Sequence, residues 1–509
     1  MNSKRTVILG LIMLMAVISL SAKTYYVSAD GNDGRDGLTA STAYATFDKA
    51  ISVASESDVI VFTGTIQLGH TVNVASGKKI VIEGSDSQMG NNVIDGCGKC
   101  GLFDVAEGAS LTLRNMVLRG GIASQRGAAV SVDHGTLTVE RCDIYNNKTA
   151  FDAGCKGGAI YAAGSTLSIV GTAFYGNKSY QGGAVFVENS QLACKETTFE
   201  ENETHLDDVT VTRPSEARGG ALMLVNSRTN IGKSSFFRNL SSGDGGAICV
   251  LTNSEGCWLD IDGCAIVSNK TGLGSIGGMH GGAFMYMVYK PFEANVRSTT
   301  IALNLATTAG GALFYAGDAE DSKLNFVNCT IFKNSTLSNS GNGGGLNINN
   351  RQSAVVNIVN SIVEGNKCAG GGNADVVFGS SKNINQYNSS VGTGQYEDYI
   401  CPQMNCQYRC FPLMPDGAWT TSGSVSLASE YGCLSDQNGF AITKPCIGSV
   451  QALDGEPLDP GVTKVEALAK DGVKGKPVVV DVEGRVLNIV PEDAKLVKRA
   501  NNGMVIIVK

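Results

Sequence analysis

Two short motifs alternate through the middle of this chain, and their regular return is the feature that most limits its fold. A strand-like segment ends on an Asn at positions 147, 177, 202, 239, 269, 304, 334 and 366. Around these Asn residues stand GAAV at 127–130, GGAI at 157–160, GGAV at 182–185, GGAL at 219–222, GGAI at 245–248, GGAF at 281–284, GGAL at 310–313 and GGGL at 343–346. Intervals of 25 to 37 residues between the Asn residues indicate a stacked repeat, in which each unit packs on its neighbours.

Each repeat unit contains short runs that alternate apolar and polar residues, such as LTV at 137–139 and LDI at 259–261. This period of two, with Gly, Asn and Ser between the runs, predicts strands and argues against amphipathic helices. Three short strands in a unit of 25 residues describe one coil of a parallel β-helix, with coils ~4.8 Å apart. The repeated Asn is expected to take a left-handed conformation and to stack into a ladder. The Gly-Gly pair supplies the return corner.

The alternation also assigns side chains to the core. Three residues before each Asn the side chain is apolar and is expected to face inward: Ile144, Phe174, Phe199, Phe236, Ile266, Ile301, Ile331 and Val363. Five residues before each Asn the side chain is small and lies on the same face: Cys142, Thr172, Thr197, Ser234, Cys264, Thr299, Cys329 and Ser361. The three cysteines of this second row are therefore predicted to be buried free thiols.

One outward row is apolar where surface positions are normally polar. The residue after each Gly-Gly-Ala-type motif is, in chain order, Ser131, Tyr161, Phe186, Met223, Cys249, Met285, Phe314 and Asn347. Stacked coils would align the middle members into a stripe about 25 Å long. The sequence predicts that Tyr161, Phe186, Met223, Met285 and Phe314 form an exposed ligand-binding face. The alternative is that the inserted loops at 203–218 and 270–280 fold over this row.

Residues 1–22, with MNSKR followed by an apolar run and SLSA, have the layout of a secretory signal peptide. A membrane anchor is the alternative, but no stop-transfer pattern follows the apolar run. Glycine at 64 and proline at 10 of 509 residues fit a backbone with many tight corners better than a disordered linker. A net charge of −7 and the absence of a basic run in the mature chain argue against nucleic acid as a partner.

Candidate catalytic groups lie in the insertions between motifs. The longest insertion carries Asp207, Asp208 and Arg213. The two carboxylates could attack a glycosidic bond, or could hold Ca²⁺ beside an arginine base. His280 lies in GGMHGG, downstream of this pair. The structural alternatives are a solvated loop for the first segment and a Gly-rich corner for the second.

Two other kinds of segment suggest metal binding. DGNDGRDG at 30–37 is similar to a calcium loop, but Ser41 stands where a bidentate Glu is needed, so an Asx-turn cap is favoured. Disulfides are favoured over zinc for the cysteines outside the repeats, which are CGKC at 97–100 and Cys401, Cys406, Cys410, Cys433 and Cys446. We expect no resident metal or cofactor, with Ca²⁺ as the open alternative.

The alternating G-G-A-[IVLF] and F-x-x-N motifs over about 127–366 resemble the repeat of the chlamydial polymorphic outer membrane proteins, a family of right-handed β-helix surface proteins. Residues 24–51 resemble the N-terminal segment of pectate-lyase-like β-helix proteins. KPCIGSVQALD at 444–454 resembles the line that closes such helices in Bacteroidetes, with Gly448 in place of Asp. VVVDVEGRVL at 478–487 and NGMVIIVK at 502–509 resemble the C-terminal sorting domain of type IX secretion, with Val505 in place of the usual Tyr.

These observations predict an all-β protein, a right-handed parallel β-helix of the pectate-lyase-like solenoid type with a small C-terminal β-sandwich-like domain. The expected divisions are a signal peptide at 1–22, an N-terminal cap with first coils at 23–120, the repeat helix at 121–380, C-terminal coils with a Cys cluster at 381–455, and a sorting or anchoring domain at 460–509.

The resemblance implies a secreted, monomeric protein at the outer-membrane surface or outside the cell, delivered by secretion machinery that reads its C-terminal domain. It would bind a glycan or a partner surface as an adhesion module. The alternative is a polysaccharide lyase or glycoside hydrolase acting on acidic polysaccharide. Clustered acidic and basic side chains from adjacent coils would favour the enzyme, and the sequence shows no such recurring pattern.

Overall fold

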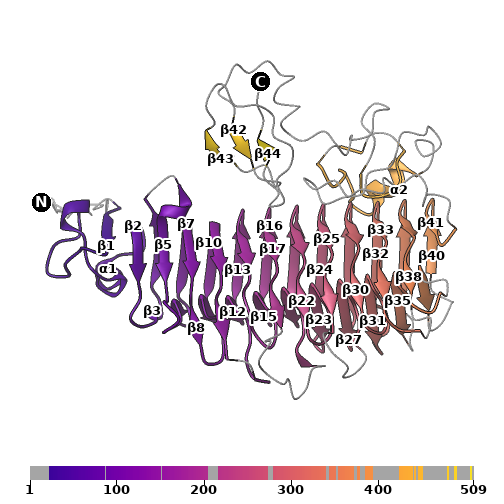
Figure 1. Cartoon of the computed structure of the whole chain (residues 1–509), viewed down its shortest axis with the longest axis horizontal. Helices are drawn as coiled ribbons and strands as arrows, with labels where there is room; N and C mark the ends of the chain where they lie inside the picture. The colour runs from indigo at the N-terminus through magenta and orange to yellow at the C-terminus, as the bar shows by residue number, and fades with distance from the viewer. Residues whose placement is uncertain are drawn as a thin grey trace, which may run out of the picture.

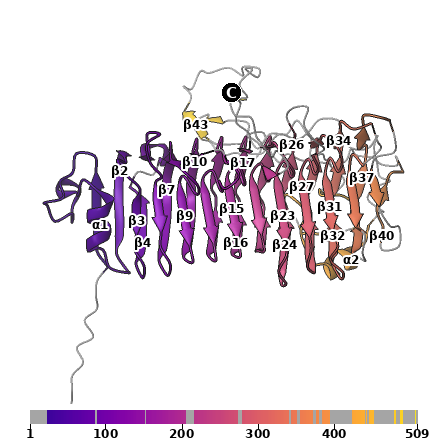
Figure 2. The same ribbon diagram turned by 90° about the horizontal axis from the view of Figure 1, so that it is seen from below.

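The protein, seen in a computed structural model, is a long stack of coils that follow one another in sequence order from indigo to orange (Figure 1). The structure describes residues 22–85, 88–150, 152–204, 216–272, 279–339, 343–350, 354–371, 375–378, 384–393, 423–439, 441–442, 445–450, 478–480, 486–489 and 505–506. A view turned by 90° shows the same single stack (Figure 2). Each repeat coil has a first strand after the Gly-Gly-Ala motif, a second and a third strand, and in most coils a two-residue strand after the Asn.

The first strands pair in parallel into one sheet of 11 strands. Its members are β3 (Val72–Val74), β6 (Phe103–Val105), β9 (Val130–Asp133), β12 (Ile160–Ala163), β15 (Val185–Glu188), β19 (Leu222–Val225), β23 (Ile248–Thr252), β27 (Phe284–Val288), β31 (Leu313–Gly317), β35 (Leu346–Asn350) and β39 (Val376–Phe378). The two-residue strands are β8 (Ile122–Ala123), β11 (Lys148–Thr149), β18 (Glu203–Thr204), β22 (Leu240–Ser241), β26 (Lys270–Thr271), β30 (Leu305–Ala306), β34 (Ser335–Thr336) and β38 (Lys367–Cys368).

The second and third strands together form a parallel sheet of 22 strands. It begins with β1 (Thr24–Ser28), β2 (Val59–Gln67), β4 (Lys79–Gly84), β5 (Asn92–Asp95), β7 (Ser110–Arg119) and β10 (Thr136–Tyr145). The later second strands are β13 (Thr166–Val170), β16 (Gln191–Lys195), β20 (Arg228–Gly232), β24 (Cys257–Asp262), β28 (Phe292–Arg297), β32 (Lys323–Val327), β36 (Val355–Val359) and β40 (Ile384–Tyr387). The later third strands are β14 (Ala173–Tyr175), β17 (Thr198–Glu200), β21 (Ser235–Phe237), β25 (Ala265–Val267), β29 (Thr300–Ala302), β33 (Thr330–Phe332), β37 (Ile362–Glu364) and β41 (Ser390–Val391).

The predicted core rows are confirmed by the strand register. Ile144 pairs with Phe174, Phe174 with Phe199, and the row continues in register to Val363. Neighbouring Phe rings of this row stack with centroids 4.7–5.0 Å apart. The three cysteines of the small row, Cys142, Cys264 and Cys329, are fully buried free thiols, as predicted. Burial raises the pKa of Cys142 to about 12, so this thiol stays protonated and inert.

The repeated Asn residues form the predicted ladder, but they are not the left-handed residues. Each Asn amide donates to the side-chain oxygen of the Asn one coil further on, over 2.9–3.1 Å from Asn147 to Asn366. The left-handed φ belongs to the residue just before the ladder position, as at Glu201 and Leu303. The expected left-handed Asn is therefore wrong, because this side chain must point into the core to reach its neighbours.

The two glycines of each Gly-Gly pair serve different purposes. The first takes a positive φ, as Gly182 does at 61°, which side-chain-bearing residues resist. The second allows two coils to approach closely, because a Cβ on Gly183 would lie 2.1 Å from the carbonyl oxygen of Gly220. The corner therefore requires glycine twice, once for backbone conformation and once for space.

The N-terminal end of the stack is covered by η1 (Ala40–Thr42) and α1 (Phe47–Val53), with η2 (Met89–Asn91) inserted between β4 and β5. The Phe47 ring packs edge-on against Phe62 at 5.5 Å between centroids, so α1 closes the open end of the core. The segment 30–37 forms Asx turns, as favoured: Oδ1 of Asn32 accepts the backbone N–H of Gly34 at 2.8 Å, and Oδ1 of Asp36 accepts that of Leu38 at 3.0 Å.

Residues 423–439, 441–442 and 445–450, which include α2 (Val425–Glu430), are called the strap because they pack against the outside of the last coils. Within the described part of the chain, Cys97, Cys100, Cys433 and Cys446 are free thiols, so the expected disulfides are wrong for these four. Further on, β42 (Val478–Val480) pairs in antiparallel fashion with β43 (Val486–Ile489) and β44 (Val505–Ile506). None of the helices among the described residues is long and apolar enough to cross a membrane.

Candidate functional site

A groove is hollowed into the outer face of the second strands between β13 and β28. It consists of two cavities of about 390 and 570 Å³ that share Ala193 and Asn230 in their linings. Strand register arranges the groove in three rows that cross the coils. The middle row contains Ser168, Ala193 and Asn230, and it forms the floor.

Small side chains make this face hollow. Ala193 projects outward at the centre of β16, beside Ser168 on β13. Gly232 ends β20 and Gly263 follows β24, so neither position contributes a side chain to the end of the groove. A hollow of this size needs several small outward residues in register on neighbouring coils.

A charged row lies along one end of the groove. Lys195, Gly232, Asp262 and Arg297 are consecutive register partners on four adjacent coils. Lys233 joins them from the turn after β20. Three basic groups and two acidic groups, Asp262 and Asp436, therefore line this end of the groove, and the excess of positive charge suits an anionic ligand.

Arg297 is the least exposed of these basic groups, with 14% of its side chain accessible. Its Nη2 lies 3.2 Å from Oδ2 of Asp260, whose Oδ1 accepts a hydrogen bond from Asn295 at 2.8 Å. Within the described residues, the buried Nε–H of Arg297 has no hydrogen-bond acceptor. A buried donor without a partner costs free energy, but this nitrogen is itself inaccessible, so the groove meets Arg297 through the rest of its guanidinium.

The two aspartates of β24 lie in different environments. Asp260 is paired with Arg297 and Asn295. Burial raises the pKa of Asp262, and the positive charge of Arg297 opposes this shift without cancelling it. Neighbouring carboxylates in unlike environments are a feature of acid–base sites.

The opposite end of the groove is aromatic and open. Gln191, Arg228 and Trp258 are register partners on three adjacent coils. Arg228 donates through Nε to the carbonyl oxygen of Gly256 at 2.9 Å, which fixes the guanidinium beside the indole. Trp258 remains 36% exposed. An exposed indole offers an apolar face to a sugar ring, while its neighbours offer hydrogen-bond donors.

The predicted stripe lies elsewhere, on the outer face of the first strands, and the expectation that it is exposed is wrong. Its members are aligned in register as predicted. Their exposed fractions are low: Tyr161 7%, Phe186 1%, Met223 2%, Met285 4% and Phe314 7%. The part of these five residues in ligand binding stays a prediction.

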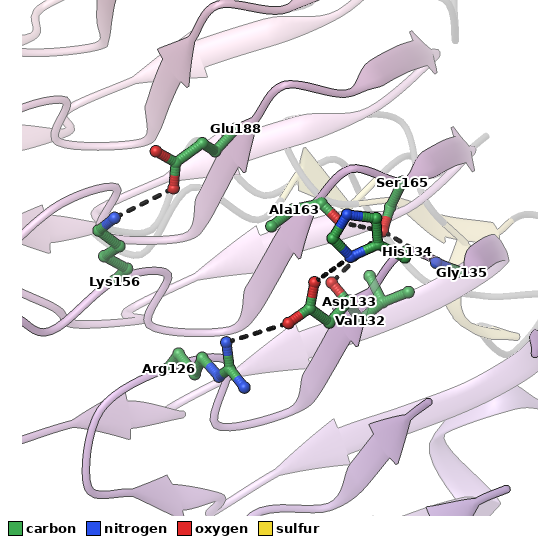
Figure 3. A network of polar contacts seen from close by, with 9 residues as sticks. All are labelled: Arg126, Val132, Asp133, His134, Gly135, Lys156, Ala163, Ser165 and Glu188. Atoms are coloured by element: carbon green, nitrogen blue, oxygen red, sulfur yellow. Dashed lines mark hydrogen bonds and ion pairs between the residues drawn. The ribbon is translucent and has the colours of Figure 1, made fainter. Parts of the chain in front are cut away.

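Part of the cover over the stripe comes from residues that precede the glycine corners. Arg126 lies over the ring of Tyr161 at 5.0 Å, and Lys156 lies over Phe186 at 4.6 Å. These cations are held by Asp133 and Glu188, at 3.4 and 3.1 Å (Figure 3). Cover by the inserted loops was the alternative to an exposed stripe, and residues 205–215 and 273–278 of those loops lie outside the described residues. The long corner side chains were missed.

His280 belongs to the same row of corner residues. Its Nδ1 lies 3.2 Å from Oδ1 of the buried Asp244, and its ring contacts that of Phe314 in a tilted arrangement, with centroids 4.3 Å apart. Arg218 approaches the other oxygen of Asp244 at 3.8 Å. The other candidate catalytic residues, Asp207, Asp208 and Arg213, lie outside the described residues. Among the described residues, no three His, Cys, Asp or Glu side chains cluster as metal ligands would.

The groove was missed because the sequence analysis followed the positions nearest the two motifs and not the outward positions of the second strands. One signal was available: Asp260 and Asp262 alternate outward on the run LDID at 259–262. Lys195, Asp262 and Arg297 each stand seven positions before a ladder Asn, and the strand register places them in one row. Clustered acidic and basic side chains from adjacent coils, the expected mark of an enzyme, are thus present.

Comparisons with known proteins agree with this architecture. Residues 78–281 match the family described as "Right handed beta helix region", and with the parallel stacked sheets this makes the chain a right-handed parallel β-helix. A pectate lyase, Pel9A, is 13% identical over 85% of this chain and 97% of its own, with a TM-score of 0.45. A rhamnogalacturonan lyase is 13% identical over 81% and 98%, with a TM-score of 0.29. The structure of XylC with xylose is 10% identical over 85% and 99%, with a TM-score of 0.34. No curated protein matches the sequence.

Proposed function

We propose that this protein binds an acidic polysaccharide in the groove on its second strands. The observation that carries the proposal is the basic end formed by Lys195, Lys233 and Arg297, which line one cavity. A uronate or sulfate group would pair with these cations, and Trp258 would stack on a sugar ring further along. A glycan-binding or adhesion role at a surface follows from such a groove without any chemical step.

The test is direct binding by calorimetry to polygalacturonate, alginate and chondroitin sulfate, with neutral dextran as the control polymer. We expect binding to the acidic polymers, weakened by salt because exposed lysines are screened. Lys195→Ala should lower the affinity several-fold, since an exposed charge contributes up to about 1 kcal/mol. Lys270→Ala is the matched control, because Lys270 is an exposed lysine on β26, outside the groove lining. Equal affinity for dextran, or equal loss in both variants, would contradict the proposal.

A second candidate function, cleavage of the bound polysaccharide, is favoured by the aspartate pair. Asp262, with its raised pKa, would donate a proton to the glycosidic oxygen, and Asp260 would act as the carboxylate partner. The two project from the same face of β24 two residues apart, so their Cα atoms are ~6.6 Å apart. Release of reducing ends from polygalacturonate or alginate would show hydrolysis, and unsaturated products would show elimination instead. Asp262→Asn should abolish hydrolysis while leaving binding intact. If the wild-type protein cleaves none of these polymers, only the binding function remains.

Export and surface display complete the proposal. The signal-peptide layout of residues 1–22 and the similarity of 478–509 to a sorting domain support it, and so does the separate antiparallel sheet of β42, β43 and β44. We expect the β-helix protein to be a monomer. A chain ending at Leu453 should fold and bind the groove ligand but fail to reach the cell surface, as measured by protease accessibility on intact cells. Normal display of that shortened chain would contradict the sorting role.

A further inference from the structure

The strap is firmly fixed to the coils beside the groove. Its apolar side chains Ala428, Cys433, Ile442 and Cys446 are buried in one cluster with Val327 and Val359. Several buried hydrogen bonds join it to side chains of the last coils. Thr300 donates to Gln437 at 2.6 Å, and Ser449 donates its backbone N–H to Thr330 at 2.9 Å. These contacts make the strap a wall of fixed position.

This wall crosses the charged end of the groove. Ser435 and Asp436 of the strap line the same cavity as Lys195, Lys233 and Arg297. The backbone carbonyl oxygen of Gln437 lies 3.6 Å from the position that a Cβ on Gly263 would take. Gly263 is at the bend where the groove would otherwise continue. Gly439 lies beside Lys233, whose Nζ is 3.3 Å from the Cβ position of Gly439. The strap therefore stands across the path of a ligand that leaves the second strands at this bend.

The other end of the groove has no such wall in its lining. The cavity there is lined by residues of the second strands and the turn before them, and Gln191, Arg228 and Trp258 are exposed. Between the two ends the groove follows β16 for five residues, Gln191–Lys195, which is about 13 Å. This length holds a short oligosaccharide. A longer chain can leave the groove past Trp258 but not past Asp436.

We infer that the groove reads the end of an acidic polysaccharide chain, and that the strap is the specificity device that excludes internal segments. The terminal residue would place its acidic group among Lys195, Lys233 and Arg297, against Ser435 and Asp436. The rest of the chain would run over Ala193 and Asn230 towards Trp258. This inference rests on the proposed binding function and names the part of the ligand that the site takes.

The first test compares polygalacturonate and alginate cut to a series of mean chain lengths and titrated at equal mass of uronate. For a site that binds chain ends, the mass concentration of uronate at half saturation falls as the chains become shorter, in inverse proportion to the number of ends per unit mass. For a site that takes internal segments, it stays constant or rises as the chains become shorter. A constant value overturns the inference while the binding function stands. Absence of binding at every length overturns the binding function itself.

The second test enlarges the wall. Ser435→Trp fills the closed end of the cavity and should lower the affinity for short acidic oligosaccharides about tenfold or more. Ser429→Trp is the matched control, because Ser429 is an exposed strap residue on α2, outside the lining of the groove. Both variants should unfold at the wild-type temperature, which shows that the strap remains docked. A folded Ser435→Trp variant with unchanged affinity would overturn the inference.

Discussion

The outer faces of the first and second strands follow the same alternation of side chains, yet one is closed and the other is open. On the first strands, the outward aromatic and Met side chains are 1–7% exposed beneath corner residues such as Lys156. On the second strands, the outward row passes through Ser168 and Ala193, and a groove remains. The comparison teaches that the side of the sheet a residue faces does not decide its exposure. The size of its neighbours on the adjacent coils and corners decides it.

The largest expected effect comes from emptying the closed face. Phe186→Ser removes a ring that is 1% exposed and packed under the Lys156 cation. The free energy of unfolding should fall by roughly 2–4 kcal/mol, somewhat less than for a Phe in a deep core. Urea unfolding followed by circular dichroism measures this loss. Affinity for the groove ligand per folded molecule should not change, and a stable variant that loses binding would reverse the roles of the two faces.

The reciprocal change fills the open face. Ala193→Trp places an indole on the floor shared by the two cavities. The affinity for acidic polysaccharide should fall at least about tenfold, or 1.4 kcal/mol. Stability should change by no more than about 0.5 kcal/mol, because Ala193 is exposed. Thr138→Trp is the control: it lies in the same outward row on β10, in register with Ser168, but outside the groove lining.

A smaller effect should come from removing the cover of the closed face. Lys156→Ala takes away the cation 4.6 Å from the Phe186 ring centroid and its ion pair with Glu188 at 3.1 Å. The expected loss in unfolding free energy is about 0.5–1 kcal/mol. Lys156→Met keeps the apolar stem and should recover part of it. If neither variant is less stable than wild type, the corner side chains are not what buries the stripe.

The smallest expected effect is a pH dependence that originates in the open face. Because burial raises the pKa of Asp262 in the folded protein, folding favours its protonated form. Its contribution to stability is therefore present below the ordinary aspartate pKa and is lost as the pH rises through the raised value. An Asn at this position cannot ionise. The unfolding free energy of the Asp262→Asn variant should therefore increase relative to that of wild type as the pH rises across that range. A gap that is independent of pH would mean that Asp262 is not buried in solution.

Much of the fold could be predicted from the sequence because a solenoid repeats its local rules. The apolar row from Ile144 to Val363, the ladder from Asn147 to Asn366 and the buried thiols follow from spacing alone, since each coil must present like residues to the next. The corner glycines follow for the same reason. The residue with positive φ was predicted one position too late in the chain. Only the structure shows that the ladder Asn points into the core and that the residue before it takes the left-handed conformation.

The candidate site depended on tertiary structure. Sequence alternation sends both Phe186 and Ala193 outward, but only the packed coils show that Lys156 covers the first while small neighbours leave the second in a hollow. Lys195 and Arg297 each stand seven positions before a ladder Asn, so the repeat aligns them, but only the structure shows that they line a hollow. The strap is joined to Thr300 and Thr330 by contacts between residues 119 to 149 positions apart in the chain. Local patterns repeat from coil to coil and can be read in the sequence, whereas a contact made once, between distant segments, has no period to reveal it.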